Sequence, residues 1–386
     1  MKPDVIVVGL GAVGSATLWQ LARRGIKALG IDRFAPPHAM GSSHGHTRIT
    51  RQAIGEGDAY VPLVLRSHEI WRELEAEGNE QLLEQCGALI IGAAGGSLFM
   101  HGRQGFVRQT VDAAQRFAIP HEILSPEETM RRYPAFTLAG DELVYFEPGG
   151  GMVFPERCIA AQLHAARRCG AAVCVDERVL AIEQIGDGVR VTTDRAVHHA
   201  AEAILAAGAW SPGLSSGALA DIALHRQVLH WMTTDRPDWF TTERMPVFMF
   251  SHGAGAEDSF YGFPLVPGME AQGVKVADEN YTTRLADPDM LDRQVQPAEA
   301  AALFRDHLDG RMSGLQRQPL RSSVCVYSCT PDSAFRVGRN RAADRILVAS
   351  ACSGHGFKHS AALGECLADA AGGHAPLALA EFALRG

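Results

Sequence analysis

Residues 4–32 carry the most constraining pattern in the chain: an apolar run, three spaced glycines, a helical stretch and a second apolar run that ends in an acid. The run Val5–Val8 is short enough for a buried parallel strand. Gly9 permits a tight turn, Gly11 lets the backbone approach a ligand, and Gly14 lets a helix pack closely on the strand. The pattern therefore predicts a strand, turn, helix and second strand that ends at Asp32.

This unit has the arrangement that binds the pyrophosphate of a dinucleotide. Its helix would begin at Ala12 and Val13, where free N–H groups and the helix dipole favour anions. Asp32 stands at the spacing of a carboxylate that accepts hydrogen bonds from an adenosine ribose, and Arg33 follows it. The alternative is a glycine turn without a ligand. Because strand, helix and acid all fall in register, we predict dinucleotide binding, and the motif leaves the identity of the dinucleotide open.

Composition and charge exclude several classes of partner. The chain has 386 residues, 46% of them hydrophobic, so it can bury the core of two domains or of one large one. A net charge of −8 gives no reason to expect nucleic acid or an anionic membrane surface. Eight cysteines without a CxxC pair indicate neither a zinc site nor a disulfide framework. No apolar run approaches the ~18 residues of a membrane helix, and a cytoplasmic enzyme is expected.

The order of patterns along the chain predicts a mixed α/β protein with two domains. A Rossmann-like cofactor domain is expected to be discontinuous and to consist of residues 1–80, 150–215 and 321–386. A substrate domain is expected from residues 81–149 and 216–320. In its larger segment, aromatic residues occur in short runs broken by Gly, Pro and Asp, which is typical of an antiparallel sheet.

Several elements of the cofactor domain can be placed from periodicity and stop signals. Apolar residues at helical spacing predict helices over residues 60–78 and 155–169. A strand is expected at 345–350, followed by a glycine-rich turn and a final helix over about 360–371. The chain is therefore expected to return to the cofactor domain at its end.

The segment 36–57 brings glycine, hydroxyl, imidazole and guanidinium groups together directly after the cofactor acid. Arg48 and Arg51 lie three residues apart, so both can reach one cavity if residues 47–52 form a helical turn or an irregular coil. Such a pair suits a planar anion, which favours a carboxylate site. The alternative is a polar surface loop whose arginines are solvated.

Further motifs occur in a fixed order along nearly the whole chain. After the N-terminal glycine unit they are Pro36–His38, Gly41–Arg51, Gly55–Gly57, Tyr60–Ser67, Tyr261–Pro264, Val324–Tyr327, Thr330–Asp332 and Ser353–Lys358. In this set and order, the chain resembles the monomeric sarcosine oxidase and N-methyltryptophan oxidase family of FAD-dependent amine oxidases. The motifs are specific for the family and much less specific for the substrate.

The resemblance implies that FAD is bound covalently. Cys325, directly before Val326 and Tyr327, matches the family cysteine that forms a thioether to the 8α carbon of the flavin ring. Cys329 lies four residues further on and is the competing candidate, but only Cys325 matches the family pattern. A small buried hydrophobic residue is the other interpretation of Cys325.

The resemblance also implies roles around the flavin. His44 and Arg48 match catalytic residues beside the isoalloxazine ring. Lys275 matches the lysine near flavin N5 where oxygen is activated, although taken alone it would be a solvated strand lysine. Arg51 and Lys358 match the two cations that hold the substrate carboxylate. The complete set of implied cofactor contacts is Gly9, Gly11, Ala12, Val13, Gly14, Asp32, Arg33, Ser42, Ser43, His44, Arg48, Val179, Cys325, Gly354, Gly356 and Lys358, and Tyr261 is implied to contact the substrate.

Two positions depart from the family pattern. The family's oxidases have a histidine four residues after the lysine, where this chain has Glu279, and a tyrosine where it has Phe260. A carboxylate in place of an imidazole changes the local charge by about one unit at most and alters which amine fits. Glu279 is therefore expected to contact the substrate, and sarcosine is expected to be a poor one. Alternatively, Glu279 points to solvent, because Asp278–Asn280 is typical of a turn.

The expected reaction is FAD-dependent oxidation of a secondary amino acid, N-methyl or cyclic, to an imine that water hydrolyses, with reduction of dioxygen to hydrogen peroxide. Arg51 and Lys358 would orient the amino acid, and Lys275 would stabilise the charge that dioxygen gains. A monomer is expected, without metal, nucleic acid or membrane. The alternatives are a flavin dehydrogenase that passes electrons to a carrier and a non-catalytic flavin-binding subunit of a larger complex.

Overall fold

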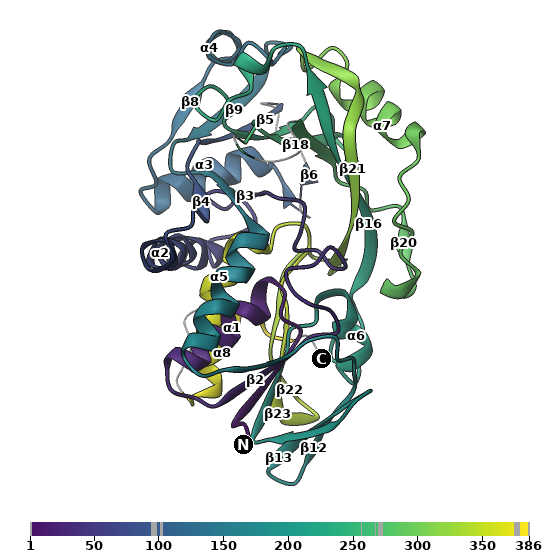
Figure 1. The fold of residues 1–386 in the computed structure, drawn as a ribbon. Coiled ribbons are helices and arrows are strands. Elements are labelled where there is room, and N and C mark those ends of the chain that lie inside the picture. The colour runs from purple at the N-terminus through teal and green to yellow at the C-terminus, as the bar shows by residue number, and fades with distance from the viewer. Residues whose placement is uncertain are drawn as a thin grey trace.

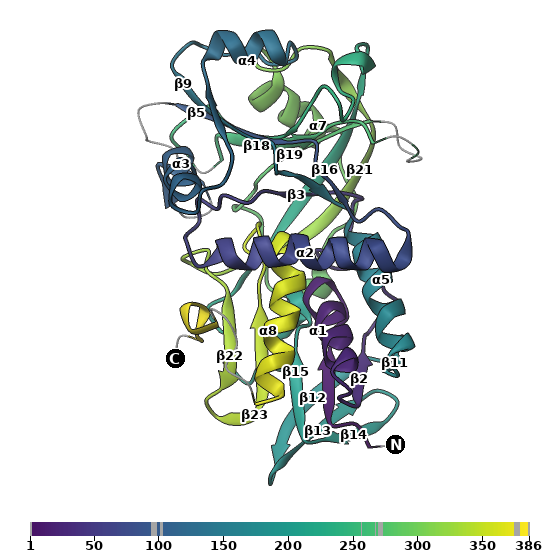
Figure 2. The same ribbon diagram turned by 90° about the vertical axis from the view of Figure 1, so that its left-hand side faces the viewer.

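The computed structural model of the chain describes residues 2–93, 99–100, 103–255, 257–266, 268, 273–373 and 379–384. Figure 1 shows two regions, one with helices layered on a sheet and, above it in this view, one built around a larger sheet. The helix α2 (Tyr60–Gly78) runs between them (Figure 2). Both ends of the described chain lie in the lower region.

Among the described residues, the lower region is built on a six-stranded sheet. Its strands, in spatial order, are β11 (Ala172–Cys174), β2 (Ala28–Ile31), β1 (Val5–Val8), β15 (Glu202–Leu205), β23 (Ala343–Ser350) and β22 (Arg336–Asn340). Neighbouring strands are parallel, except that β22 is antiparallel to β23. The helices α1 (Ala12–Arg23), α5 (Pro155–Arg168) and α8 (Ser360–Ala371) cover one face (Figure 2). A small sheet of β12 (Val179–Ile185), β13 (Gly188–Thr193) and β14 (Val197–Ala200) lies against the other.

The first strand is apolar at every position because both of its faces are buried. Val5 and Val7 pack in the core formed with α1, α2, α5 and α8, whereas Ile6 and Val8 pack in the core formed with the small sheet. A strand covered on both faces has no polar side to present to water. The predicted order of strand, helix and second strand ending next to Asp32 is confirmed, as are the helices over 60–78 and 360–371.

In the described part of the chain, the upper region is built on a nine-stranded sheet. Its order is β20 (Arg284–Leu285), β16 (Ala223–Thr234), β19 (Val274–Asp278), β18 (Ser259–Phe263), β17 (Val247–Ser251), β5 (Ala88–Ala93), β9 (Glu142–Glu147) and β8 (Glu122–Leu124), with β21 (Leu315–Cys329) paired to β16. The predicted antiparallel pairing is correct except for β5 and β17, which run parallel. One face packs on α4 (Pro126–Arg132) and α7 (Pro297–Leu303), and the other faces the lower region (Figure 1).

The long strands β16 and β21 extend from the upper sheet toward the lower region (Figure 1). The predicted domain boundary between residues 320 and 321 falls inside β21, so this strand would belong to both domains.

The remaining strands of the described chain are short. A three-stranded sheet consists of β3 (Arg48–Thr50), β10 (Gly151–Val153) and β4 (Leu83–Glu84), and β6 (Phe99–Met100) pairs with β7 (Arg103–Gln104). The remaining α-helices of the described chain are α3 (Phe106–Arg116) and α6 (Ser211–Leu214). Within the described ranges, no helix combines the length and apolarity needed to cross a membrane.

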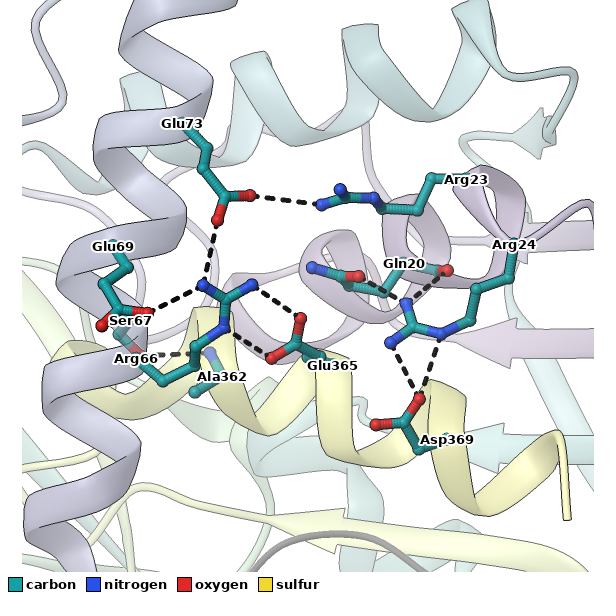
Figure 3. Close-up of polar contacts among 10 residues, drawn as sticks. All are labelled: Gln20, Arg23, Arg24, Arg66, Ser67, Glu69, Glu73, Ala362, Glu365 and Asp369. Carbon is teal, nitrogen blue, oxygen red and sulfur yellow. Dashed lines mark hydrogen bonds and ion pairs between the residues drawn. The ribbon is translucent and has the colours of Figure 1, made fainter. Parts of the chain in front are cut away.

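Charged side chains join the helices on the six-stranded sheet (Figure 3). Arg66 of α2 donates to the carboxylate of Glu365 on α8 through two nitrogens, at 2.8 and 2.9 Å, and to Glu73 at 2.9 Å. Arg24, at the end of α1, lies 2.8 Å from Asp369 of α8. These groups are partly exposed, so each pair contributes about 1 kcal/mol at most. The apolar core therefore remains the main cause of helix packing.

Candidate functional site

A cavity of about 860 Å³ lies at the carboxyl ends of the parallel strands, the usual place for a ligand in such a sheet. Its volume is within the range of cofactor and ligand sites. The predicted cofactor contacts that line it are Gly9, Gly11, Ala12, Val13, Asp32, Arg33, Ser42, Ser43, Arg48, Val179, Gly354 and Gly356. One cavity thus brings together residues from both ends of the chain.

Two of the N-terminal glycines are required by the protein itself. Gly9 has a φ of +87°, and a Cβ there would lie 2.5 Å from the Cα of Ala207. A Cβ on Gly14 would lie 1.7 Å from the carbonyl oxygen of Gly9, because the helix packs directly on the turn. At Gly11 a Cβ would meet only Ser43, at an ordinary 3.7 Å. The need for glycine at position 11 therefore depends on the ligand.

The start of α1 fits a phosphate of the dinucleotide, and the carboxylate of Asp32 fits the ribose of its first nucleotide. No side chain caps α1, and its first turn holds no acid, so its N–H groups can receive a phosphate. Asp32 accepts the N–H of Leu10 at 2.7 Å and that of Phe34 at 2.8 Å, one on each oxygen. Since each carboxylate oxygen can accept a second bond, Asp32 retains capacity for ribose hydroxyls.

The sequence did not predict that Arg33 and Trp210 contact Asp289 at this end of the cavity. Arg33 donates to both oxygens of Asp289, at 2.6 and 2.9 Å, and the Trp210 indole donates to the same carboxylate at 2.9 Å. Residues 284–289 line the cavity although they come from the segment assigned to the substrate domain. Trp210 could have been found, because it follows the strand β15. Nothing in the sequence around Asp289 marks it.

The condition under which Arg48 and Arg51 would reach one cavity, a helical turn or an irregular coil over residues 47–52, is not met. Residues 48–50 form β3, which pairs with Gly151–Val153 of β10. Side chains three apart on extended backbone point to opposite sides. Consequently Arg48 lines the large cavity and donates to the carbonyl oxygens of Ser42, at 2.6 Å, and Thr47, at 2.8 Å, whereas Arg51 turns away from it.

Cys325 and His44 lie behind the lining near Arg48. Cys325 is fully buried on β21, on the same face as Tyr327, which lines the cavity. Burial raises the pKa of its thiol, against the opposing effect of Arg48 and Lys275. Burial and Arg48 lower the pKa of His44 to about 3, so its imidazole is neutral. Its buried Nε2 has no hydrogen-bond partner among the described residues, which fits a polar atom of a bound flavin.

Lys275 is buried on β19, with 2% of its surface exposed, so the alternative of a solvated strand lysine is wrong. Its Nζ donates to the carbonyl oxygens of Gly45, at 2.9 Å, and Thr47, at 2.7 Å, and to the Thr47 hydroxyl at 3.2 Å. Burial, assisted by the charge of Arg48, lowers its pKa well below the ordinary value. A small void of about 10 Å³, roughly the volume that one water molecule needs, also borders Lys275.

Arg51 and Lys358 meet at one buried carboxylate. Arg51, 1% exposed, donates to both oxygens of Glu56 at 2.6 and 2.8 Å, and Lys358 lies 3.6 Å from the same group. Burial lowers the pKa of Lys358 to about 8, although Glu56 acts against this. The interpretation of Arg51 as a solvated loop arginine is therefore wrong. The motif Gly55–Gly57 does not by itself predict that Glu56 is the partner of both cations.

The two departures from the family pattern lie in different places. Glu279 is 7% exposed at the end of β19, and the Tyr281 hydroxyl donates to it at 2.9 Å, so the solvent-facing alternative is wrong. Tyr261 lies on the site side of β18, with its hydroxyl 3.4 Å from that of Tyr327. Phe260 points to the opposite face and packs in the core with phenylalanines of β17. Of the two departures, only Glu279 therefore lies near Tyr261 and Tyr327, on whose hydroxyls its charge acts.

Comparison with known proteins identifies the family. The family model described as FAD dependent oxidoreductase matches residues 4–370. Monomeric sarcosine oxidase from Streptomyces avermitilis is 36% identical over 370 residues, which cover 95% of this chain and 93% of that protein. N-methyl-L-tryptophan oxidase from Salmonella heidelberg is 31% identical over 386 residues, covering 97% and 96%. The solved structure of NikD, an unusual amino acid oxidase essential for nikkomycin biosynthesis, has a TM-score of 0.81 at 25% identity, covering 96% and 94%. The chain therefore belongs to the FAD-dependent oxidoreductase family, and its resemblance to the sarcosine and N-methyltryptophan oxidases is confirmed.

Proposed function

We propose that this chain oxidises a secondary α-amino acid, N-methyl or cyclic, to an imine that water hydrolyses, and reduces dioxygen to hydrogen peroxide. The observation that carries the proposal is the buried pair Arg51 and Lys358. Lys358 directly follows Gly356 and Phe357, which line the large cavity. Bound FAD supplies the acceptor for the hydride that leaves the carbon next to the amine nitrogen. The names of the two similar curated proteins support N-methyl amino acids as the substrate class.

In this proposal Arg51 and Lys358 hold the substrate carboxylate. With Glu56 ionised, the three groups carry a net charge of +1, so one further carboxylate would neutralise them. Glu56 has to release at least one of its bonds to Arg51 before the substrate can take its place. The N–H of Nη2 that is released would then bind the substrate carboxylate, while Nη1 stays on the carbonyl oxygen of Ala53 at 2.6 Å, and Lys358 would add a point charge. The carboxylate would be held at two points, and the amine would be oriented toward the flavin.

Lys275 is proposed to act on dioxygen by its charge. An ammonium group has three N–H donors. Those of Lys275 have three oxygens within hydrogen-bond distance, the carbonyl oxygen of Gly45 and the carbonyl and hydroxyl oxygens of Thr47. In its protonated form the side chain therefore has no spare hydrogen bond to offer, but its positive charge in a water-poor site stabilises the negative charge that dioxygen gains. Because burial lowers the pKa of Lys275, this effect is lost as the pH rises. His44 is neutral and Arg48 is held by loop carbonyls, which suits a role in orienting the flavin ring.

A panel of amines with peroxide release as the readout tests the function. It should contain sarcosine, a larger N-methyl amino acid, proline, a six-membered cyclic amino acid and an N-methyl amine without a carboxylate. Because buried Glu279 replaces an imidazole, we expect a larger N-methyl or a cyclic amino acid to be the best substrate and sarcosine a poor one. Equal turnover of the amine without a carboxylate would refute this site. Electron transfer to an artificial acceptor without oxygen uptake would indicate the dehydrogenase, and no flavin reduction by any amine would indicate the non-catalytic subunit.

We predict that Cys325→Ala converts a covalently bound flavin into a dissociable one. Cys325 shares its strand face with Tyr327 and is close enough to Arg48 for that charge to act on its thiol. After acid precipitation, the flavin absorbance should stay in the wild-type pellet and move to the supernatant of the variant. Cys329→Ala is the matched control, since Cys329 is a buried thiol on the same strand face, and it should behave as wild type. A yellow supernatant from the wild-type protein would contradict the thioether.

The monomeric state and a cytoplasmic location are part of the same proposal. The name of the monomeric sarcosine oxidase relative supports the first. The cysteine usage and the net charge of −8 are compatible with the second. Sedimentation of the holoenzyme would test the state of assembly directly.

A further inference from the structure

Glu156, in the first turn of α5, contacts the loop that holds Lys275. One carboxylate oxygen of Glu156 accepts the backbone N–H of Gly45 at 2.7 Å and that of His46 at 3.1 Å. The carbonyl oxygens of Gly45 and Thr47 accept the hydrogen bonds of Lys275. The carboxylate and the ammonium therefore bind the same short loop, residues 45–47, and share the peptide group between Gly45 and His46, of which Glu156 accepts the N–H and Lys275 binds the carbonyl oxygen.

Glu156 also supplies negative charge where cations gather. The charged or titratable groups that act most strongly on Lys275 are Arg48 of β3, Arg321 and Cys325 of β21, and Glu156. The two arginines oppose protonation of Lys275, whereas Glu156 favours it. Burial opposes ionisation of Glu156, but the N–H of His46, other backbone donors and Arg48 hold the pKa of this carboxyl below its usual range. Glu156 is therefore an anion at neutral pH.

We propose that Glu156 is a positioning residue for the reaction with dioxygen, which fixes the 45–47 loop under Lys275 and provides the negative charge that balances its ammonium. The inference rests on the proposed function, in which Lys275 acts on dioxygen, and extends it to a residue of a different element. Glu156 does not need to touch the substrate or dioxygen. Its effect passes through the loop backbone and through charge.

Three variants separate geometry from charge. In Glu156→Gln the side-chain oxygen can still accept both N–H bonds, but the negative charge is lost. In Glu156→Ala both are lost. Glu75→Gln is the matched control. Glu75 lies on the helix α2, and one of its oxygens likewise accepts two successive backbone N–H groups, that of Leu82 at 2.7 Å and that of Leu83 at 2.8 Å.

The first measurement follows the protonation of Lys275 directly. The chain contains four lysines, Lys2, Lys27, Lys275 and Lys358, so NMR of the holoenzyme labelled with ¹³Cε-lysine gives a short spectrum that Lys275→Met assigns. Loss of the nearby negative charge favours the neutral amine, so Glu156→Gln should move the Lys275 midpoint down by about half a pH unit or more. Glu75→Gln should leave it unchanged. This readout does not depend on turnover.

The second measurement compares the two half-reactions by rapid mixing. Glu156→Gln should slow reoxidation of the reduced flavin by dioxygen about tenfold, and Glu156→Ala by more, with little change in flavin reduction by the amino acid. Since only protonated Lys275 carries the charge, reoxidation should fall as the pH rises, and in Glu156→Gln this fall should come at lower pH.

Three outcomes would count against the inference. Wild-type Lys275 titration and reoxidation in both Glu156 variants would overturn it, and so would equal losses in both half-reactions, which indicate a merely structural residue. If Lys275→Met itself reoxidises at the wild-type rate, the proposed role of Lys275 fails first and the inference fails with it. The behaviour of that variant therefore separates the two failures.

Discussion

Replacement of Lys275 by methionine is expected to slow reoxidation of the reduced flavin by dioxygen by about 10²–10³-fold. Dioxygen gains negative charge in its first reduction step, and a buried cation stabilises that charge more than an exposed one does. Loss of hydride from the amino acid has less need of the cation, so flavin reduction should change far less. Methionine keeps much of the length of the side chain beside Phe263 but removes the charge.

Stopped-flow measurement of the two half-reactions checks this prediction. Lys27→Met is a suitable control, because Lys27 is an exposed lysine before β2 and should reoxidise at the wild-type rate. A lysine that only braces the 45–47 loop would give similar losses in both half-reactions, and that result would refute the role in oxygen activation.

Replacement of Arg51 or Lys358, the two cations proposed to bind the substrate carboxylate, should raise KM for the amino acid about 10- to 100-fold. Each of Arg51→Ala and Lys358→Ala leaves the substrate carboxylate with one cation instead of two. In a pocket that excludes water, this costs about 1.5–3 kcal/mol. Lys358→Met is the cleaner variant, because Glu56 keeps both of its hydrogen bonds to Arg51.

The control for this prediction is an N-methyl amine that lacks a carboxylate. This amine should show the same kinetics in wild type and Lys358→Met, because it has no carboxylate for the cation to bind. For the amino acid, KM should rise above about pH 8, where burial places the pKa of Lys358 and the ammonium loses its proton. Lys358→Met should lack this rise. Equal losses for both amines would mean that Lys358 supports the fold instead of the carboxylate.

The nucleotide-binding half could be predicted from the sequence because its signals are local. Gly9 and Gly14 have no space for a side chain, and the run Val5–Val8 is apolar because both faces of β1 are covered. Such constraints act within about thirty residues and are written in the spacing. The roles at the flavin came from the family resemblance, and the structure supplies their partners.

The rest depends on contacts between distant segments, which spacing does not encode. Arg48 and Arg51 could reach one cavity only from a helical turn or an irregular coil, but pairing with β10, about a hundred residues later, makes residues 48–50 a strand. Pairing with distant strands commonly overrides local preference in this way. Glu156 lies far along the chain from the loop it holds, and Asp289 reaches the cofactor cavity from the other region. None of these partners has a local signature.

The most direct test of the proposed oxidase reaction is anaerobic addition of a secondary amino acid to the holoenzyme, followed by readmission of oxygen. We expect the flavin absorbance to bleach with the amino acid but not with the matching amine lacking a carboxylate. Oxygen should then restore the absorbance and yield about one hydrogen peroxide per flavin. Bleaching without recovery in oxygen, or no bleaching by any N-methyl or cyclic amino acid, would contradict the proposed reaction.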